Sequence, residues 1–189
     1  MSRRYKFHDQ GKMYFVTYTV VNWMDLFTRN EYKMILLDSL RYCIQNKGLE
    51  VFSWCIMTNH VHLIIGTIGD NMENILRDHK RHTSETLINA ILSHPGESRK
   101  DWIIGQFKDA AKNNSNNRHY QLWQQHNKPI EVYTPEVVYK YMDYIHNNPV
   151  KAGFVEYPEH WLYSSARDYA GKKGLLDCMT PIDIGMWGE

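Results

Sequence analysis

The pair His60 and His62 contains the residues most clearly suited to chemistry in this sequence. They belong to a pattern typical of two strands, over 50–57 and 60–66, joined by a short turn. Side chains alternate between the faces of a strand, so both imidazoles are expected on one face, about 7 Å apart. Neutral imidazole is a common metal ligand, and the pair could bind one divalent ion. The alternative is two solvated or hydrogen-bonded strand histidines, because a His-x-His pair also occurs by chance.

Tyr144 and Asn148, much further along the chain, form a second candidate group. Thr134-Pro135-Glu136 favours a helix start, with a capping hydroxyl, a proline in the first turn and an early acid. We expect this helix to run to about Asn148, where Pro149 ends it. Residues four apart lie on one helix face, so Tyr144, as a nucleophile, and Asn148, as a third metal ligand, could both face the histidines. The alternative is a packed aromatic and a simple helix stop, since spacing alone does not select Tyr144 among 13 tyrosines.

Hydrophobic patterning predicts the elements that would position these residues. Strands are predicted over 13–21, 50–57, 60–66 and 120–125, and helices over 30–46, from Asp70 or Asn71 to about 92, and over 134–148. Asn30 is expected to cap the first helix and Lys47-Gly48 to end it. The segment 93–120, which holds a His-Pro-Gly turn and a run of asparagines, is predicted to be a mobile loop. The order of elements predicts an α+β fold with a β-α-β-β-α-β plait.

Composition limits the classes of protein to consider. The 189 residues and 43% hydrophobic content are typical of one globular domain, and we predict a single domain over 1–189 with an aromatic tail from 151. The net charge of +1 means that nucleic acid would have to be held by local basic patches. Three widely separated cysteines favour free thiols in a reducing compartment. We expect a cytoplasmic protein with no membrane partner, because the sequence has no apolar leader or spanning run.

Several motifs together make the sequence similar to a known family. Asn59-His60-Val61-His62-Leu63-Ile64 follows a Trp-led strand, and the last predicted helix carries Tyr144-Ile145-His146-Asn147-Asn148-Pro149-Val150-Lys151-Ala152-Gly153. Leu122-Trp123-Gln124 precedes that helix, and Trp161-Leu162-Tyr163-Ser164-Ser165 follows it. The combination, which extends over roughly residues 10 to 170, resembles the single-tyrosine HUH transposases and is most similar to their REP-associated branch.

The resemblance implies a fold, a reaction and a set of site residues. The fold would be a ferredoxin-like plait, with a core over about 10–150 and the catalytic helix laid across the open face of the sheet. His60 and His62 would be the HUH pair, Asn148 the helix-borne third ligand and Tyr144 the nucleophile. Tyr144 would attack a phosphodiester of single-stranded DNA and form a 5′-phosphotyrosine, with Mg²⁺ or Mn²⁺ as the cofactor.

The expected partner is single-stranded or hairpin DNA, bound by a monomer or a homodimer. Two basic groups could contact its phosphates. The first is on the second predicted helix and contains Arg77, Lys80 and Arg81. The second is in the 93–120 segment and contains Lys108, Lys112 and Arg118. The first group could instead be an ordinary solvated face of the helix.

Three other functions are compatible with parts of the pattern. A domesticated protein could bind hairpin DNA without cutting it, although the histidines, tyrosine and asparagine are all present. A histidine-triad nucleotidyl hydrolase or transferase is excluded because Ile64 stands where the third histidine would be. A replication or conjugative nickase shares the histidine pair, but the segment Asn148–Gly153 favours the transposase branch.

Overall fold

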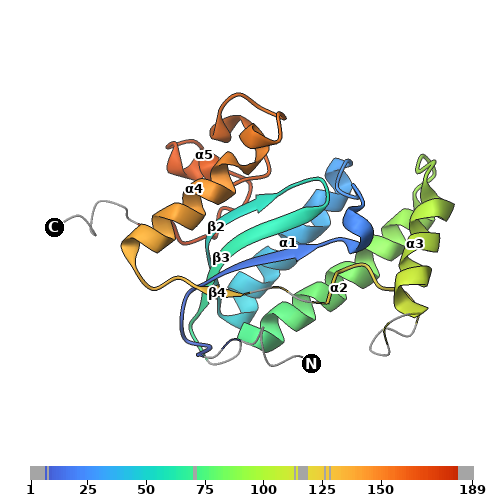
Figure 1. Cartoon of the computed structure of the whole chain (residues 1–189), viewed down its shortest axis with the longest axis horizontal. Helices are drawn as coiled ribbons and strands as arrows, with labels where there is room; N and C mark the ends of the chain where they lie inside the picture. The colour runs from blue at the N-terminus through green and yellow to red at the C-terminus, as the bar shows by residue number, and fades with distance from the viewer. Residues whose placement is uncertain are drawn as a thin grey trace.

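A four-stranded antiparallel sheet lies at the centre of the protein, and its strand order is β2-β3-β1-β4 (Figure 1). The computed structural model describes residues 7, 9–69, 72–112, 114, 119–125, 127 and 129–182. The strands are β1 (Tyr14–Thr19), β2 (Leu49–Ile56), β3 (His60–Thr67) and β4 (Ile130–Glu131). The helices are α1 (Asn30–Lys47), α2 (Met72–Ser93), α3 (Lys100–Lys112), α4 (Pro135–Lys151) and α5 (Ala166–Tyr169), with 3₁₀ turns η2 (Val21–Trp23) and η3 (Pro158–His160).

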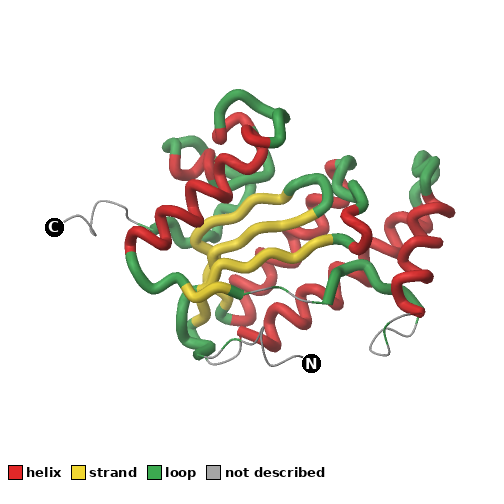
Figure 2. The backbone as a smooth tube through the Cα atoms, viewed as in Figure 1, coloured by secondary structure: helices red, strands yellow, loops and turns green. Residues whose placement is uncertain are grey.

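The predicted α+β plait is confirmed by the order of elements and by the layers on the sheet. Helices α1 and α2 lie behind the sheet in Figure 2, and α4 packs on the opposite face, near β2. Along the chain, β1 is followed by α1, and α1 is followed by the hairpin of β2 and β3 and then by α2. This is the order that a β-α-β-β-α-β plait requires. The helix that was predicted to lie on the open face of the sheet is α4. No described helix has the combination of length and apolar character that crossing a membrane requires.

Period-two alternation along β3 separates a core face from a site face. Val61, Leu63 and Ile65 are buried in the cluster shared with α1 and α2, whereas Ile64 packs in a second cluster beneath α4. β3 pairs with β1, and this register sets Thr17 opposite His62. The expected common face of the two histidines follows from this alternation.

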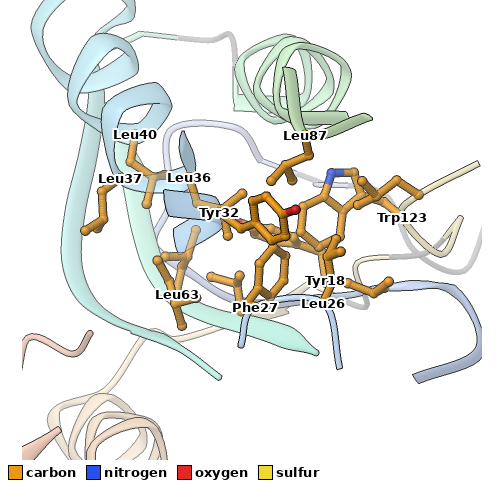
Figure 3. Close-up of a cluster of buried hydrophobic side chains, with 14 of the residues drawn as sticks. Tyr18, Leu26, Phe27, Tyr32, Leu36, Leu37, Leu40, Leu63, Leu87 and Trp123 are labelled. Carbon is orange, nitrogen blue, oxygen red and sulfur yellow. The ribbon is translucent and has the colours of Figure 1, made fainter. Parts of the chain in front are cut away.

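The larger core lies between the sheet and α1 and α2, and it is rich in aromatic residues (Figure 3). Trp123 stacks on Phe27 and meets Tyr18 edge-on. The buried His79 ring makes hydrogen bonds to two hydroxyl groups. Its Nε2 lies 3.0 Å from the Tyr18 oxygen, and its Nδ1 lies 2.9 Å from Ser39 Oγ. These bonds satisfy polar groups that would otherwise be costly to bury.

The 93–120 segment was expected to be a mobile loop, and this prediction is wrong for residues 93–112, whereas residues 113 and 115–118 lie outside the described residues. It contains α3, whose Ile103, Ile104, Phe107 and Ala111 are buried at helical spacing. The turn before α3 is anchored by Glu97, a buried carboxylate that accepts hydrogen bonds from Arg29 Nε at 2.9 Å and from the Tyr32 hydroxyl at 3.2 Å. Turn signals at both ends of the segment concealed a short amphipathic helix between them.

The fourth strand is also misplaced by the sequence pattern. Residues 120–125 contribute one isolated bridge, between Trp123 and Val20, and β4 is formed later, at Ile130–Glu131, against Tyr14 and Phe15 of β1. Trp123 turns its ring into the core, where Nε1 donates to Thr83 Oγ1 at 3.2 Å. The segment still forms backbone hydrogen bonds beside β1, from the Val21 amide to the Leu122 carbonyl and from the Gln124 amide to the Thr19 carbonyl, each at 2.8 Å, but these do not extend into a regular ladder.

The helix ends show two smaller differences. The residue before α1 is Arg29, which makes no side-chain cap, so Asn30 is the first helical residue and not the predicted cap. α4 continues through Pro149 to Lys151, because a proline in the last turn removes only the bond to the carbonyl of Ile145. The predicted stop of α1 at Gly48 is confirmed by its left-handed φ of 72°. Asp70 and Asn71, the predicted start of the second helix, lie outside the described residues.

The residues after α4 pack along the outer edge of β2. The amide of Ile56 donates to the carbonyl of Tyr163 at 2.9 Å, and the amide of Thr180 donates to the carbonyl of Val51 at 2.9 Å. These bonds cover an edge strand whose free backbone groups would otherwise be open to another chain.

Replacing Phe107 by alanine is expected to lower the free energy of unfolding by about 3–5 kcal/mol, because it removes a fully buried ring between α3 and the core. Trp102→Ala on the same helix is the matched control, since this side chain is 54% exposed and its loss should cost less than about 1 kcal/mol. Urea denaturation followed by circular dichroism measures both variants. Equal effects would show that α3 is not docked on the core.

The buried His79 predicts a loss of stability in acid. Burial and the nearby charges of Lys80 and His82 lower the pKa of His79 to about 3, whereas an unfolded imidazole titrates near 6.5. The unfolded chain therefore binds the extra proton first, and stability that is complete above about pH 6.5 is lost as the pH falls toward 3. At pH 5 this one group should lower the free energy of unfolding by about 2 kcal/mol.

His79→Leu is expected to be less stable at neutral pH, because the Tyr18 and Ser39 hydroxyls lose their partner. Its stability should nevertheless depend less steeply on pH between 4 and 6.5, by the equivalent of about one proton. Urea titrations over this pH range measure the slope. A slope equal to that of the unchanged protein would contradict the assignment.

Candidate functional site

The two histidines of β3 lie side by side on the face of the sheet that α4 covers. Their ring centroids are 4.6 Å apart, and the rings meet at a steep angle. His62 is almost fully buried, and His60 is half-buried nearer the β2–β3 turn. Of the two imidazoles, that of His60 is therefore the more accessible to solvent.

Each imidazole is held at Nδ1 by a neighbouring side chain. Thr17 Oγ1 lies 2.7 Å from His62 Nδ1, and Asn59 Oδ1 lies 2.6 Å from His60 Nδ1. The Asn59 amide is oriented by its Nδ2, which donates to the Trp23 carbonyl at 3.2 Å and to Asp25 Oδ1 at 3.0 Å. Because Asn59 Oδ1 can only accept, His60 carries its proton on Nδ1, and its Nε2 is an unprotonated acceptor on the side of Asn148.

Burial keeps both rings neutral. It lowers the pKa of His62 to about 3, with a further contribution from His60, and it lowers the pKa of His60 against the opposing influence of Asn148 and Asp25. A neutral imidazole with an available Nε2 is the form that binds metal ions. Both imidazoles are therefore neutral at neutral pH, which is the state that binding of a metal ion would require.

Helix α4 brings the second candidate group to the histidines. Val138, Met142, Ile145 and Pro149 are buried toward the sheet, so the adjacent stripe of the helix faces along the sheet surface. On that stripe Asn148 Nδ2 lies 3.3 Å from His62 Nε2, and the ring centroids of Tyr144 and His62 are 5.1 Å apart. The structure therefore brings all four predicted residues together.

Tyr144 is distinguished from its neighbours by where its ring lies. It lies edge-to-face against both His62 and Phe15, and 40% of the residue is exposed. Tyr141, one turn earlier, stacks flat on Phe15 at 4.4 Å. Lys151 Nζ is 6.0 Å from the Tyr144 ring centroid and adds positive charge beside it.

The donor set available for a metal is two imidazoles and one amide. Among the described residues, no three histidine, cysteine or carboxylate side chains are placed to hold a metal ion. His146, although next to Tyr144 in sequence, contributes nothing here, because its Nε2 meets Ser165 Oγ at 2.9 Å and Ser53 Oγ at 3.2 Å. Burial lowers the pKa of His146 to about 4, which is consistent with a neutral structural histidine.

The three residues of the predicted basic group on α2 differ in their exposure to solvent. Arg77 and Arg81 are exposed and both approach Asp78. Lys80 is half-buried, and its Nζ donates to the Gln124 carbonyl at 3.1 Å and to Asn127 Oδ1 at 2.7 Å. Burial also lowers the pKa of Lys80 to about 8. Because its ammonium group is bound to Gln124 and Asn127, Lys80 does not extend the exposed basic surface.

The second basic group is on an ordered helix and not on a flexible loop. Lys108 and Lys112 are exposed on α3, where Lys112 Nζ pairs with Asp109 at 2.7 Å. Arg118 lies outside the described residues. Figure 1 places α3 and α4 at opposite ends of the molecule, so these lysines are remote from Tyr144.

Sequence reasoning missed the residues that hold the histidines. Asn59 stands next to His60 in the motif, and its amide could have been considered as a partner. Thr17 is identified only by the strand register, and Asp25 and Trp23 come from a turn that no sequence pattern connects to the site.

Comparisons with known proteins agree with this architecture. No protein-family model and no curated protein matches the chain. A solved structure described as a REP-associated tyrosine transposase bound to a REP hairpin matches with a TM-score of 0.64. The match covers 97% of this chain and 93% of the other at 19% sequence identity. The chain therefore has the fold of a REP-associated tyrosine transposase.

Proposed function

We propose that this protein is a metal-dependent transesterase that nicks and rejoins single-stranded DNA beside a hairpin, through a phosphotyrosine at Tyr144. The observation that carries the proposal is the meeting of Tyr144 and Asn148 on α4 with His60 and His62 on β3. The fold shared with a hairpin-bound transposase supports hairpin DNA as the substrate class.

The site residues fit Mg²⁺ or Mn²⁺ as the cofactor. His60 and His62 would offer Nε2, because Nδ1 of each is occupied. Asn148 would offer its amide oxygen after a turn of its side-chain amide, because Nδ2 is the atom that faces His62 Nε2 in the structure. When bound there, a divalent ion would polarise the scissile phosphate and stabilise the negative charge that develops on it. Hard ions of this kind accept oxygen ligands from phosphate and water for the remainder of their shell.

The chain's own residues supply the nucleophile and its position. The Tyr144 oxygen would form a bond to phosphorus while the bond from phosphorus to the 3′-oxygen breaks, and the phenol proton is balanced by the proton gained at the departing 3′-hydroxyl. The product is a 5′-phosphotyrosine that a 3′-hydroxyl can attack in the reverse sense. The bond energy retained in that ester makes strand transfer independent of ATP.

Binding of the hairpin would rest on local charge, since the net charge is only +1. Arg77 and Arg81 on α2 and Lys108 and Lys112 on α3 are the exposed cations proposed to contact phosphates. Lys151, beside Tyr144, would lie nearest to the reacting phosphate. Arg118 keeps its predicted role without structural support.

Tyr144→Phe is expected to abolish a covalent protein–DNA adduct completely, because it removes the only atom that forms the ester. The measurement uses labelled hairpin oligonucleotides with randomised single-stranded flanks and Mn²⁺, followed by denaturing gel electrophoresis. Sequencing the captured strands then identifies the cleaved site.

Tyr141→Phe is the matched control, because Tyr141 stacks on Phe15 one turn away and should keep the adduct. An adduct that survives Tyr144→Phe would contradict the assignment of the nucleophile. Hairpin binding without any adduct in the unchanged protein would replace the transesterase by a protein that binds hairpins without cutting them.

Thr17→Val is expected to weaken Mn²⁺ binding by roughly tenfold to a hundredfold, because valine has a similar shape but cannot hold His62 Nδ1. Isothermal titration calorimetry without DNA measures this directly. Thr67→Val, a change of the same kind at a buried position further along β3, is the control and should leave the affinity unchanged. Equal affinities of all three proteins would show that Thr17 does not orient a metal ligand.

A further inference from the structure

Trp23, in η2, stands at the open side of the histidine pair with its side chain directed toward solvent. It is 62% exposed, and its ring centroid lies 6.1 Å from that of His60 in an edge-to-face arrangement. Tryptophan is normally retained in the core or at an interface because of its large apolar surface. An exposed indole beside a candidate reaction centre therefore requires an explanation.

The backbone at this position is unfavourable for a large side chain. Asn22 has a φ of 57° and Trp23 a φ of 53°, and they are the positive-φ residues other than glycine in the described chain. Asparagine tolerates the left-handed region, but a bulky aromatic residue is disfavoured there. Strain of this kind persists where the surrounding structure enforces it, and it is concentrated at ligand sites.

Two sets of contacts enforce the conformation. On one side, the Trp23 carbonyl accepts from Asn59 Nδ2 at 3.2 Å, and the same amide contacts His60 Nδ1 through Oδ1 at 2.6 Å. On the other side, Asn22 Nδ2 donates to Gln106 Oε1 of α3 at 2.7 Å. One asparagine therefore ties the backbone of the exposed tryptophan to a proposed metal ligand.

We propose that Trp23 is the stacking platform for an unpaired nucleobase next to the phosphate held at His60 and His62. This inference rests on the proposed function, since it requires single-stranded DNA at the site. An indole face binds any base by stacking, so the contact would hold the strand without reading its sequence. Because Asn59 connects Trp23 to His60, the position of the stacked base and the position of the phosphate would be set by one rigid frame.

The structure offers a control for ordinary surface tryptophan. Trp102 of α3 is 54% exposed, close to the value for Trp23, but it lies on a regular helix. A general affinity of exposed indoles for DNA would appear at both positions. A stacking platform at the reaction centre would appear only at Trp23.

The test is a double-mutant cycle in which Trp23 is changed in the protein and the tail bases are removed from the DNA. The parent protein is Tyr144→Phe, so that no covalent product forms. The probes are two labelled hairpins, one with short single-stranded thymidine tails and one whose tails have the same phosphates but abasic sugars. Fluorescence anisotropy gives the dissociation constants. Removing the bases should weaken binding to the parent by about tenfold.

Trp23→Ala in that parent should bind the thymidine hairpin about tenfold more weakly and should not distinguish the two probes. Trp23→Phe should recover part of the difference, and Trp102→Ala should behave as the parent. The proposal is overturned if Trp23→Ala keeps the full penalty for base removal, or if the parent shows no penalty.

The adduct assay with Tyr144 intact separates this outcome from that of the proposed function. A base-dependent contribution at Trp23 without any adduct would support the stacking platform and reject the transesterase. If the protein with Tyr144 forms an adduct, but binding by the Tyr144→Phe parent shows no base dependence at Trp23, the transesterase is supported and the platform is rejected.

Discussion

The packing of α4 across the sheet is the contact on which the candidate site depends, because it joins two groups of residues that are far apart in the chain. Phe15 and Ile64 of the sheet bury Met142 and Ile145 of the helix. Successive helical residues are about 100° apart, so burial of those two side chains fixes the rotation of α4 about its axis. The rotation that buries Ile145 also directs Tyr144 and Asn148 toward His62. Apolar packing thus determines the geometry of the polar site.

Burial alone does not make a reactive histidine in this protein. Burial lowers the pKa of His79 and of His62 to about 3 and that of His146 to about 4. The nitrogens of His79 and the Nε2 of His146 are engaged by hydroxyl groups inside the fold, so their neutral rings serve packing. His62 differs because its Nε2 faces the Asn148 amide, next to an exposed tyrosine. What distinguishes His62 from these two structural histidines is its surroundings, because His60, the Asn148 amide and the ring of Tyr144 all adjoin it.

Local periodicity predicts the parts of the site, but not how they meet. A period of two places His60 and His62 on one face, and a four-residue spacing places Tyr144 and Asn148 on one helix stripe. Strong apolar repeats likewise predict α1, α2, α4 and the β2–β3 hairpin within a few residues. The meeting of the two groups depends on tertiary packing, which only the family resemblance could indicate. The sequence pattern did not predict α3 or β4. A short amphipathic helix between turn signals and a two-residue strand both carry little periodic information.

The helix that local patterns miss is connected to the site that they identify. Gln106 of α3 holds Asn22, whose neighbour Trp23 has its carbonyl bound by Asn59, and Asn59 in turn holds His60. Asp25 accepts from both Asn59 and Thr58, so the β2–β3 turn is fastened to the same frame. A segment free to move at this end could not maintain two consecutive left-handed residues beside His60. Order in α3 therefore supports the position of His60, although the helix itself contributes no group to the proposed reaction.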